Sequence, residues 1–285
     1  MKTHHLDIIL ERETSFGAGA IASKLTGRPL ILELIGPRYS KYSLRQSKRV
    51  ILYSKTMLQD AVPREKLFFV TAATNTESFK PNAQMRKTIR KKFELCDHLV
   101  IGYVGTFPQW HGIEDLIRAS VQILKQESSI KFLMVGPYFE YAQNITKKLG
   151  VETAFIFTGP VAYQEVPNYI NAADIMVAPY NPNRDEMRKR YGIGSPIKIF
   201  EYMACGKPVV TTDLKLITDI VQKGETGLIV PPGDVNKLAG SLIKLIDNPK
   251  EAREMGQQAR RTVEHQYSWG VLTEKIVDVL EQCRR

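Results

Sequence analysis

Short apolar runs of strand length alternate with stretches of helical periodicity along most of this chain, and this alternation limits the folds that are open to it. Strands that alternate with helices form βαβ units, whose strands join into parallel sheets covered by helices. The sequence therefore predicts an α/β protein. The expected strands span residues 7–10, 30–34, 50–53, 67–70, 98–104, 130–135, 154–157, 175–178, 208–211 and 227–230.

The number of strand and helix units predicts two unequal domains. A chain of 285 residues holds material for about two domains of roughly 150 residues each. Residues 95–285 carry enough units for a complete, Rossmann-type doubly wound parallel sheet, whereas residues 1–85 supply only a partial α/β domain. The polar, basic segment 86–94 is interpreted as a linker between them. The last helix, at about 268–284, is expected to cross back to the N-terminal domain.

The chain is strongly basic, with 40 Lys and Arg against 30 Asp and Glu and a net charge of +10. Such a charge favours anionic partners, among them phosphates, acidic lipids and nucleic acids, without choosing between them. The basic run at 86–92 is interpreted first as a solvated helix face. Because no base-stacking motif accompanies it, nucleic-acid binding ranks as a distant hypothesis.

The three cysteines, Cys96, Cys205 and Cys283, lie far apart in the sequence. Their number and spacing indicate neither a disulfide framework nor a metal site, so a reducing compartment is expected. The sequence contains no apolar stretch typical of a signal peptide or a membrane span. A cytoplasmic protein is therefore expected.

Two loops at expected strand ends are the first candidates for a binding site, because open parallel sheets bind ligands at the carboxyl ends of their strands. The first is the segment Gly105-Thr106-Phe107-Pro108-Gln109-Trp110-His111-Gly112, which leads into a helix from residue 113. A glycine directly after a strand lets the backbone approach a ligand closely. On this pattern alone, a tight turn with Trp110 as local packing is the favoured alternative.

The second loop, at 179–196, is longer and opens a helix that carries two charged residues. Ser195 is a suitable N-cap and Pro196 suits the first helical position. Lys198 would then lie in the first turn, where a cation opposes the helix dipole unless an anion lies between them. Glu201 follows on the same face, where it could accept hydrogen bonds from hydroxyl groups. A ribose diphosphate would suit the pair, and an ordinary salt bridge on a surface helix is an equally weighted alternative.

Several motifs together resemble those of family 4 glycosyltransferases, which have the GT-B fold. The stretch Ser-Pro-Ile-Lys-Ile-Phe-Glu-Tyr-Met-Ala-Cys-Gly-Lys-Pro-Val-Val at 195–210 is similar to a signature of their donor-binding domain. The segments 101–107, 110–112, 157–161 and 173–180 carry further matches. The resemblance covers residues 95–285 well and continues upstream through 7–12, 29–37 and 70–81.

This resemblance implies that a sugar moves from a nucleotide-diphosphate donor, of the UDP or GDP type, to an acceptor with retention of configuration. It implies hexosyltransferase-type chemistry with no cofactor and no metal. The acceptor would be a glycan, a lipid-linked molecule or a small molecule. The basic surface would also permit peripheral contact with the inner face of a membrane, as in some members of the family.

The resemblance also carries roles to matching residues of this sequence. Glu201 corresponds to the carboxylate that binds the donor ribose, and the backbone at Val161 would touch the base. No residue is assigned to the chemical step. The donor diphosphate would be held by Lys198, Ser195, Gly194, Pro196, Ile197, Gly105 and Thr106, with further donor contacts from His111, Arg188 or Arg190.

The sequence also departs from the family pattern. Ile193 stands where the family has an acid eight residues before the ribose carboxylate. Thr106 and His111 stand where many members have Arg and Lys, so more of the phosphate charge would rest on Lys198. The first residues resemble a strand deep inside the family's acceptor domain, so the chain would act either alone or with a partner chain that supplies the remaining part. The competing hypothesis is a non-catalytic protein that binds a nucleotide or nucleotide sugar, or that serves as an interaction protein.

Overall fold

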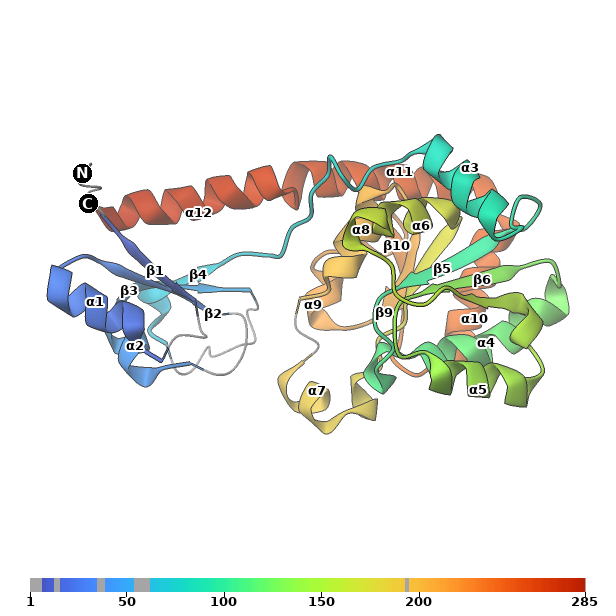
Figure 1. Cartoon of the computed structure of the whole chain (residues 1–285), viewed down its shortest axis with the longest axis horizontal. Helices are drawn as coiled ribbons and strands as arrows, with labels where there is room; N and C mark the ends of the chain where they lie inside the picture. Colours follow the sequence, from blue (N-terminus) through green and yellow to red (C-terminus); the bar gives the residue numbers. More distant parts are fainter. Residues whose placement is uncertain (1–6, 13–15, 35–38, 54–61, 193–194, 285) are drawn as a thin grey trace. The chain divides into compact units, whose positions relative to one another are not determined.

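The computed structural model describes residues 7–12, 16–34, 39–53, 62–192 and 195–284, which form two compact units (Figure 1). The first unit combines the chain up to Ala72 with the C-terminal segment from Trp269. The second unit comprises Ala73–Ser268. Among the described residues, no helix is both long enough and apolar enough to cross a membrane.

The first unit is built on a four-stranded, fully parallel sheet in the order β1-β2-β3-β4. One face packs against the C-terminal helix α12 (Trp269–Arg284), where Ile31 and Ile51 cluster with Val279. The opposite face, with Leu32 and Leu52, packs near helix α2. The elements are β1 (Ile9–Arg12), α1 (Ala18–Thr26), β2 (Leu30–Leu34), α2 (Lys41–Gln46), β3 (Ser47–Leu52), a 3-10 turn (Arg64–Lys66) and β4 (Leu67–Phe69).

The second unit contains a six-stranded parallel sheet in the order β10-β9-β8-β5-β6-β7. The chain thus builds outward in one direction from β5 to β7 and in the other from β8 to β10, as in a doubly wound fold. Its strands are β5 (Val100–Val104), β6 (Lys131–Val135), β7 (Phe155–Phe157), β8 (Ile175–Ala178), β9 (Val209–Thr212) and β10 (Gly227–Val230).

Helices cover both faces of this sheet (Figure 1). The α-helices are α3 (Ala83–Lys92), α4 (Ile113–Gln126), α5 (Glu140–Leu149), α6 (Val166–Ala172), α7 (Glu186–Tyr191), α8 (Ile197–Ala204), α9 (Lys215–Thr218), α10 (Val235–Asp247) and α11 (Pro249–Gln266). Short 3-10 helices occur at Gln109–His111 (η2), Glu152–Ala154 (η3), Tyr163–Glu165 (η4) and Pro182–Arg184 (η5).

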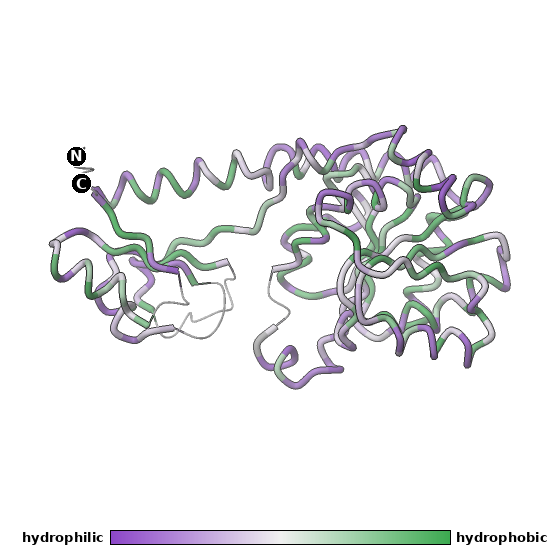
Figure 2. The backbone as a smooth tube through the Cα atoms, in the orientation of Figure 1, coloured by the Kyte–Doolittle hydropathy of each residue, from purple (hydrophilic) through white to green (hydrophobic). Residues whose placement is uncertain are grey.

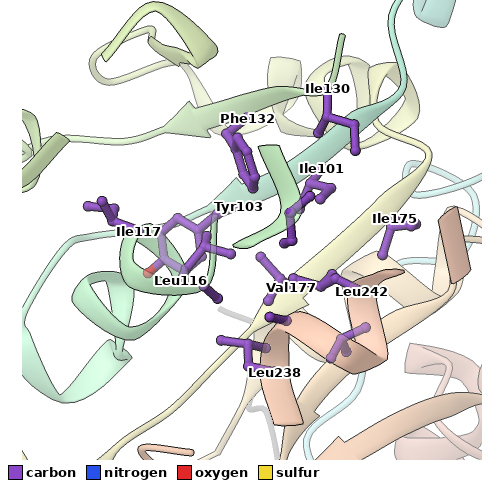
Figure 3. Packing of buried hydrophobic residues seen from close by; sticks show 14 of the residues in the cluster. Ile101, Tyr103, Leu116, Ile117, Ile130, Phe132, Ile175, Val177, Leu238 and Leu242 are labelled. Carbon is purple, nitrogen blue, oxygen red and sulfur yellow. The ribbon is translucent and has the colours of Figure 1, made fainter. Parts of the chain in front are cut away.

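The core of the second unit lies between its sheet and the helices α4 and α10. Ile101 and Val177 from the strands pack with Leu116 and Leu242 from these helices (Figure 3). The strands are predominantly hydrophobic, whereas the surrounding helices alternate between hydrophilic and hydrophobic residues (Figure 2). The helices therefore turn one face to the core and the other to solvent, as amphipathic helices do.

The basic segment predicted to be a linker is instead part of a helix. Residues 83–92 form α3, which packs on α6 within the second unit. Arg86 and Arg90 both pair with Asp174, at 2.5 and 3.1 Å, and both donate hydrogen bonds to the carbonyl of Ala172 at the end of α6. Cations at a helix C-terminus satisfy its free carbonyls, so this basic run has a structural role. The chain passes from one unit to the other after residues 72 and 268, and α12 belongs to the first unit.

Candidate functional site

The candidate site lies where β5 and β8 end, at the point where the strand order of the second unit reverses. Gly105 follows β5 with φ of 144°, a conformation that side chains rarely adopt. A Cβ atom at this position would lie 2.7 Å from the Nζ atom of Lys198. The absence of a side chain at Gly105 therefore lets the ammonium group of α8 approach the end of β5.

Lys198 is held by aromatic side chains rather than by an acid. Its Nζ donates a hydrogen bond to the hydroxyl of Tyr103 at 2.8 Å and lies 4.4 Å from the centre of that ring. The ring of Tyr180 is 5.4 Å away. Burial lowers the pKa of Lys198 to about 7, although the negative charge of Glu201 raises this pKa in part. In the described part of the chain no carboxylate forms an ion pair with Nζ, so the site holds a cation with capacity for an anionic ligand.

Glu201 lies one turn further along α8 and is only 7% exposed. Its Oε1 accepts a hydrogen bond from the Tyr163 hydroxyl at 2.9 Å. Burial raises the pKa of Glu201, although the bond from Tyr163 and the charge of Lys198 lower it in part. Among the described residues, Glu201 and Lys198 form no salt bridge with each other, so the pair is not the ordinary surface ion pair that the spacing alone also allowed.

His111 is a neutral member of this cluster. Its Nδ1 lies 2.7 Å from the carbonyl oxygen of Thr106 and 2.7 Å from the Tyr103 hydroxyl. Burial lowers the pKa of His111 to about 3, and the charges of Lys198 and Arg188 add to this effect. The imidazole therefore brings no charge to a ligand at neutral pH. It instead fixes the backbone of Thr106, whose own side chain is exposed.

The start of α8 differs from the prediction. The helix begins at Ile197 with Pro196 as its N-cap, and Ser195 is not the capping residue. The N–H of Ile197 donates to the carbonyl of Ser195 at 3.0 Å, and Pro196 has no N–H to donate. Gly194, like Ile193, lies outside the described residues. Because Pro196 has no N–H and the N–H of Ile197 is already bonded, these two residues offer an anion no free amide, and the charge of Lys198 becomes the main attraction.

Arg188 supplies a second cation near this edge. Its guanidinium lies 4.6 Å from the centre of the Trp110 ring, which in turn stacks on Tyr180 with centroids 5.8 Å apart. Arg184, by contrast, pairs with Glu114 and Asp115 at 2.5 Å each, and these pairs anchor the loop after β8.

The remaining predicted residues occupy less central positions. Arg190 lies on α7 with its side chain exposed. Val161 is partly buried and follows β7, which is separated from β5 in the sheet by β6.

Sequence reasoning missed the aromatic residues that hold the charged pair. Tyr103 and Tyr180 lie within or directly after apolar strands, where the pattern alone indicates core packing. Tyr163 lies in the short turn η4 and carries no periodic signal. Together, a buried carboxylate and a cation that pairs with no carboxylate among the described residues, one helical turn apart, can bind a ligand that carries both hydroxyl and phosphate groups.

Comparisons with known proteins show which family this chain resembles. The family model described as "Glycosyl transferases group 1" matches residues 85–262, more than half of the chain. A GDP-mannose-dependent alpha-(1-6)-phosphatidylinositol monomannoside mannosyltransferase of Mycobacterium tuberculosis is 27% identical over 220 residues, which cover 76% of this chain and 56% of that protein. An alpha-D-kanosaminyltransferase of Streptomyces kanamyceticus is 20% identical over 93% of this chain and 75% of that protein. The chain spans about half the length of the mannosyltransferases it matches.

Solved structures share the fold. Anabaena HepE in complex with UDP superposes with a TM-score of 0.81 at 20% identity, covering 96% of this chain and 79% of that one. Sucrose-phosphate synthase from Thermosynechococcus elongatus gives a TM-score of 0.76 at 21% identity, with coverage of 97% and 73%. The fold predicted from the sequence is thus confirmed as the α/β architecture of GT-B glycosyltransferases. With this fold and the match over residues 85–262, the chain belongs to the group 1 glycosyl transferases.

Proposed function

We propose that this chain binds a nucleotide-diphosphate sugar at the carboxyl edge of the second unit's sheet and transfers the sugar to an acceptor with retention of configuration. One observation carries the proposal. The ammonium of Lys198 has no carboxylate partner among the described residues, lies beside the bare backbone of Gly105, and stands one turn from the buried Glu201. A diphosphate and a ribose diol supply the two complementary groups that this pair lacks.

The proposed chemistry follows from these positions. Lys198 would pair with the diphosphate, and this negative charge would return the lysine to its charged form. As the bond between the anomeric carbon and the phosphate oxygen breaks, negative charge grows on the departing diphosphate. A cation fixed before the reaction stabilises that charge more in the transition state than in the bound donor. Glu201 would hold the ribose and so place the diphosphate against Lys198.

The names of similar proteins support a donor of the UDP or GDP type. The mycobacterial relative is named as GDP-mannose-dependent, and HepE is described in complex with UDP-glucose. For the acceptor, a phosphatidylinositol mannoside in one relative's name points to a lipid-linked molecule. The net charge of +10 is compatible with peripheral contact with an anionic membrane, and we propose such contact at the inner face of a membrane. Glycan and small-molecule acceptors remain alternatives to be tested.

Release of nucleotide from UDP-glucose and from GDP-mannose, with and without candidate acceptors, tests the proposal. We expect one donor to be consumed by the full chain, and Glu201→Ala to lower kcat/KM for that donor by about ten- to a hundredfold, the effect of losing a charged hydrogen bond. Glu254→Ala, at an exposed position on α11, is the matched control and should leave kcat/KM unchanged. Tight donor binding without turnover would favour the non-catalytic hypothesis, and full activity of Glu201→Ala would reject the site.

A further inference from the structure

A tyrosine that no sequence motif singled out contacts the carboxylate of the candidate site. Tyr163 begins η4, the turn that follows β7, and its hydroxyl donates a hydrogen bond to Oε1 of Glu201 at 2.9 Å. The tyrosine is 55% exposed, whereas Glu201 is 7% exposed. The Tyr163 side chain therefore connects a buried carboxylate to the accessible surface of the second unit.

The position of this hydroxyl is set by packing. The ring of Tyr163 lies against Phe79, with centroids 5.6 Å apart and a tilt of 53° between the ring planes. Phe79 is itself buried, with 1% of its surface exposed. A phenylalanine at position 163 would keep this ring contact and lose the hydroxyl alone.

The hydrogen-bonding capacity of the pair is only partly used. A carboxylate can accept bonds at both oxygens, and a tyrosine hydroxyl that donates one bond can still accept another. Oε1 of Glu201 accepts from Tyr163, and within the described part of the chain no hydrogen bond reaches Oε2. Among the described residues, the Tyr163 hydroxyl and the second carboxylate oxygen are thus two neighbouring acceptors that receive no hydrogen bond.

We propose that Tyr163 and Glu201 together receive the ribose diol of the donor, with one hydroxyl donating to Glu201 and the adjacent hydroxyl donating to Oη of Tyr163. This inference rests on the proposed function and deepens it, because it selects ribonucleotides over nucleotides that lack one of these hydroxyls. The bond between Tyr163 and Glu201 also fixes the orientation of the carboxylate toward the ligand. Tyr163 is thus a specificity-determining residue of the donor site.

A purely structural role for Tyr163 would have a different consequence. If its hydroxyl served only to satisfy a buried carboxylate, its removal would weaken every nucleotide to the same degree, whichever ribose hydroxyls are present. If the hydroxyl contacts the ribose, its removal should matter only for nucleotides that carry the matching hydroxyl. A cycle that combines the protein variant with deoxynucleotides separates these two roles.

The experiment is calorimetric titration of the full chain with UDP, GDP and the 2′-deoxy and 3′-deoxy forms of both. For the base that the wild type binds more tightly, Tyr163→Phe should weaken the ribonucleotide about five- to tenfold, the effect of one lost hydrogen bond. With one of the two deoxy forms, wild type and variant should bind equally. Inorganic pyrophosphate, which carries no ribose, should bind both proteins equally.

Tyr267→Phe is the matched control, because the Tyr267 hydroxyl bonds the carbonyl of Asp219 at 3.2 Å and its ring packs on Phe200. It should leave all affinities unchanged. If Tyr163→Phe weakened the ribonucleotide and its 2′-deoxy and 3′-deoxy forms equally, or weakened none of them, the role of Tyr163 would be overturned while the proposed function stayed intact. A wild-type chain that binds neither UDP nor GDP would overturn both.

Discussion

Gly112 joins η2 to α4 with φ of 71°, and a Cβ atom there would lie 1.8 Å from the carbonyl oxygen of Pro179. Any side chain would therefore push apart the two loops that follow β5 and β8. We expect Gly112→Ala to lower the free energy of unfolding by about 3 kcal/mol or more, since a backbone clash adds to the left-handed strain.

Gly150 provides the control for this prediction. It also has a positive φ, of 68°, but no atom lies within 4 Å of a Cβ built there. Gly150→Ala should lower the free energy of unfolding by only about 1–2 kcal/mol, the strain term alone. Urea unfolding of both variants makes the comparison, and equal losses would show that the approach of Pro179 to Gly112 is not tight.

The lowered pKa of Lys198, about 7, predicts that donor binding is linked to a proton. Above pH 7 the lysine of the ligand-free protein is mostly neutral, whereas the bound diphosphate favours its charged form. Binding at pH 8 should therefore take up a proton, and affinity should fall as pH rises through this range. Titrations in two buffers of different ionisation enthalpy measure the uptake. Lys198→Met should abolish this uptake, and an unchanged uptake in the variant would assign the proton to another group.

The same pKa has a consequence for stability in the absence of ligand. The folded-state pKa of Lys198 lies below the ordinary value of 10.5, so the unfolded chain binds more protons between pH 7 and that value. The contribution of this group to stability therefore rises as pH increases through that window. The buried charge of Lys198 thus destabilises the ligand-free protein. Such a cost is expected for a residue that is kept for ligand binding rather than for stability.

The charged pair was predictable because Lys198 and Glu201 follow a strand end at a spacing that only a helix brings together. The side chains that tune the pair were not predictable. Tyr103 and Lys198 are hydrogen-bonded but 95 residues apart in the sequence, and Tyr163 and Glu201 are 38 residues apart. Contacts of this kind depend on strand order, which local patterns do not encode.

The helix α3 depends on a buried charge network. Arg90, whose side chain is 8% exposed, pairs with Asp174 and donates to the carbonyl of His98. Burial raises the pKa of Asp174, but the charges of Arg86 and Arg90 and the N–H of Val100 outweigh it and lower the pKa overall. The ionised carboxylate of Asp174 therefore stabilises the folded state, and this contribution is lost as pH falls through the folded-state pKa of Asp174.

We expect Asp174→Ala to lower the free energy of unfolding by about 3–5 kcal/mol, because it leaves buried Arg90 without its ion pair. Glu254→Ala, which removes an exposed pair with Lys250 at 4.0 Å, should change stability by less than about 0.5 kcal/mol. Chemical denaturation at pH 7 gives both values. A loss below about 1 kcal/mol for Asp174→Ala would show that α3 is dispensable, as a linker would be.

The strands were the most predictable elements. The runs at 30–34, 175–178 and 227–230 coincide with β2, β8 and β10, and the other runs differ from their strands by a few residues at the ends. Fully buried parallel strands are apolar along their whole length, which makes them visible in a sequence. The segment 86–94 was interpreted as a linker because the partner to which its arginines bond, the end of α6, is one that only the tertiary fold supplies.

The two units have separate hydrophobic cores, and every residue proposed to hold the donor belongs to the second. Leu52, in the first unit, is fully buried, so Leu52→Ala should lower the stability of that unit by about 2–5 kcal/mol. Donor affinity should remain that of the wild type at temperatures where the variant is folded. Calorimetric unfolding and ligand titration measure the two effects, and a matched loss of affinity would place part of the donor site in the first unit.

The donor site itself is tested by calorimetric titration of the full chain, and of its Lys198→Ala variant, with UDP, GDP, ADP and their sugar conjugates. Binding should be selective for one base, and the variant should lose about ten- to a hundredfold in affinity, as expected for a charged contact with the diphosphate. If none of these nucleotides binds, or if Lys198→Ala binds as tightly as the wild type, the carboxyl edge of β5 and β8 is not a nucleotide-sugar site.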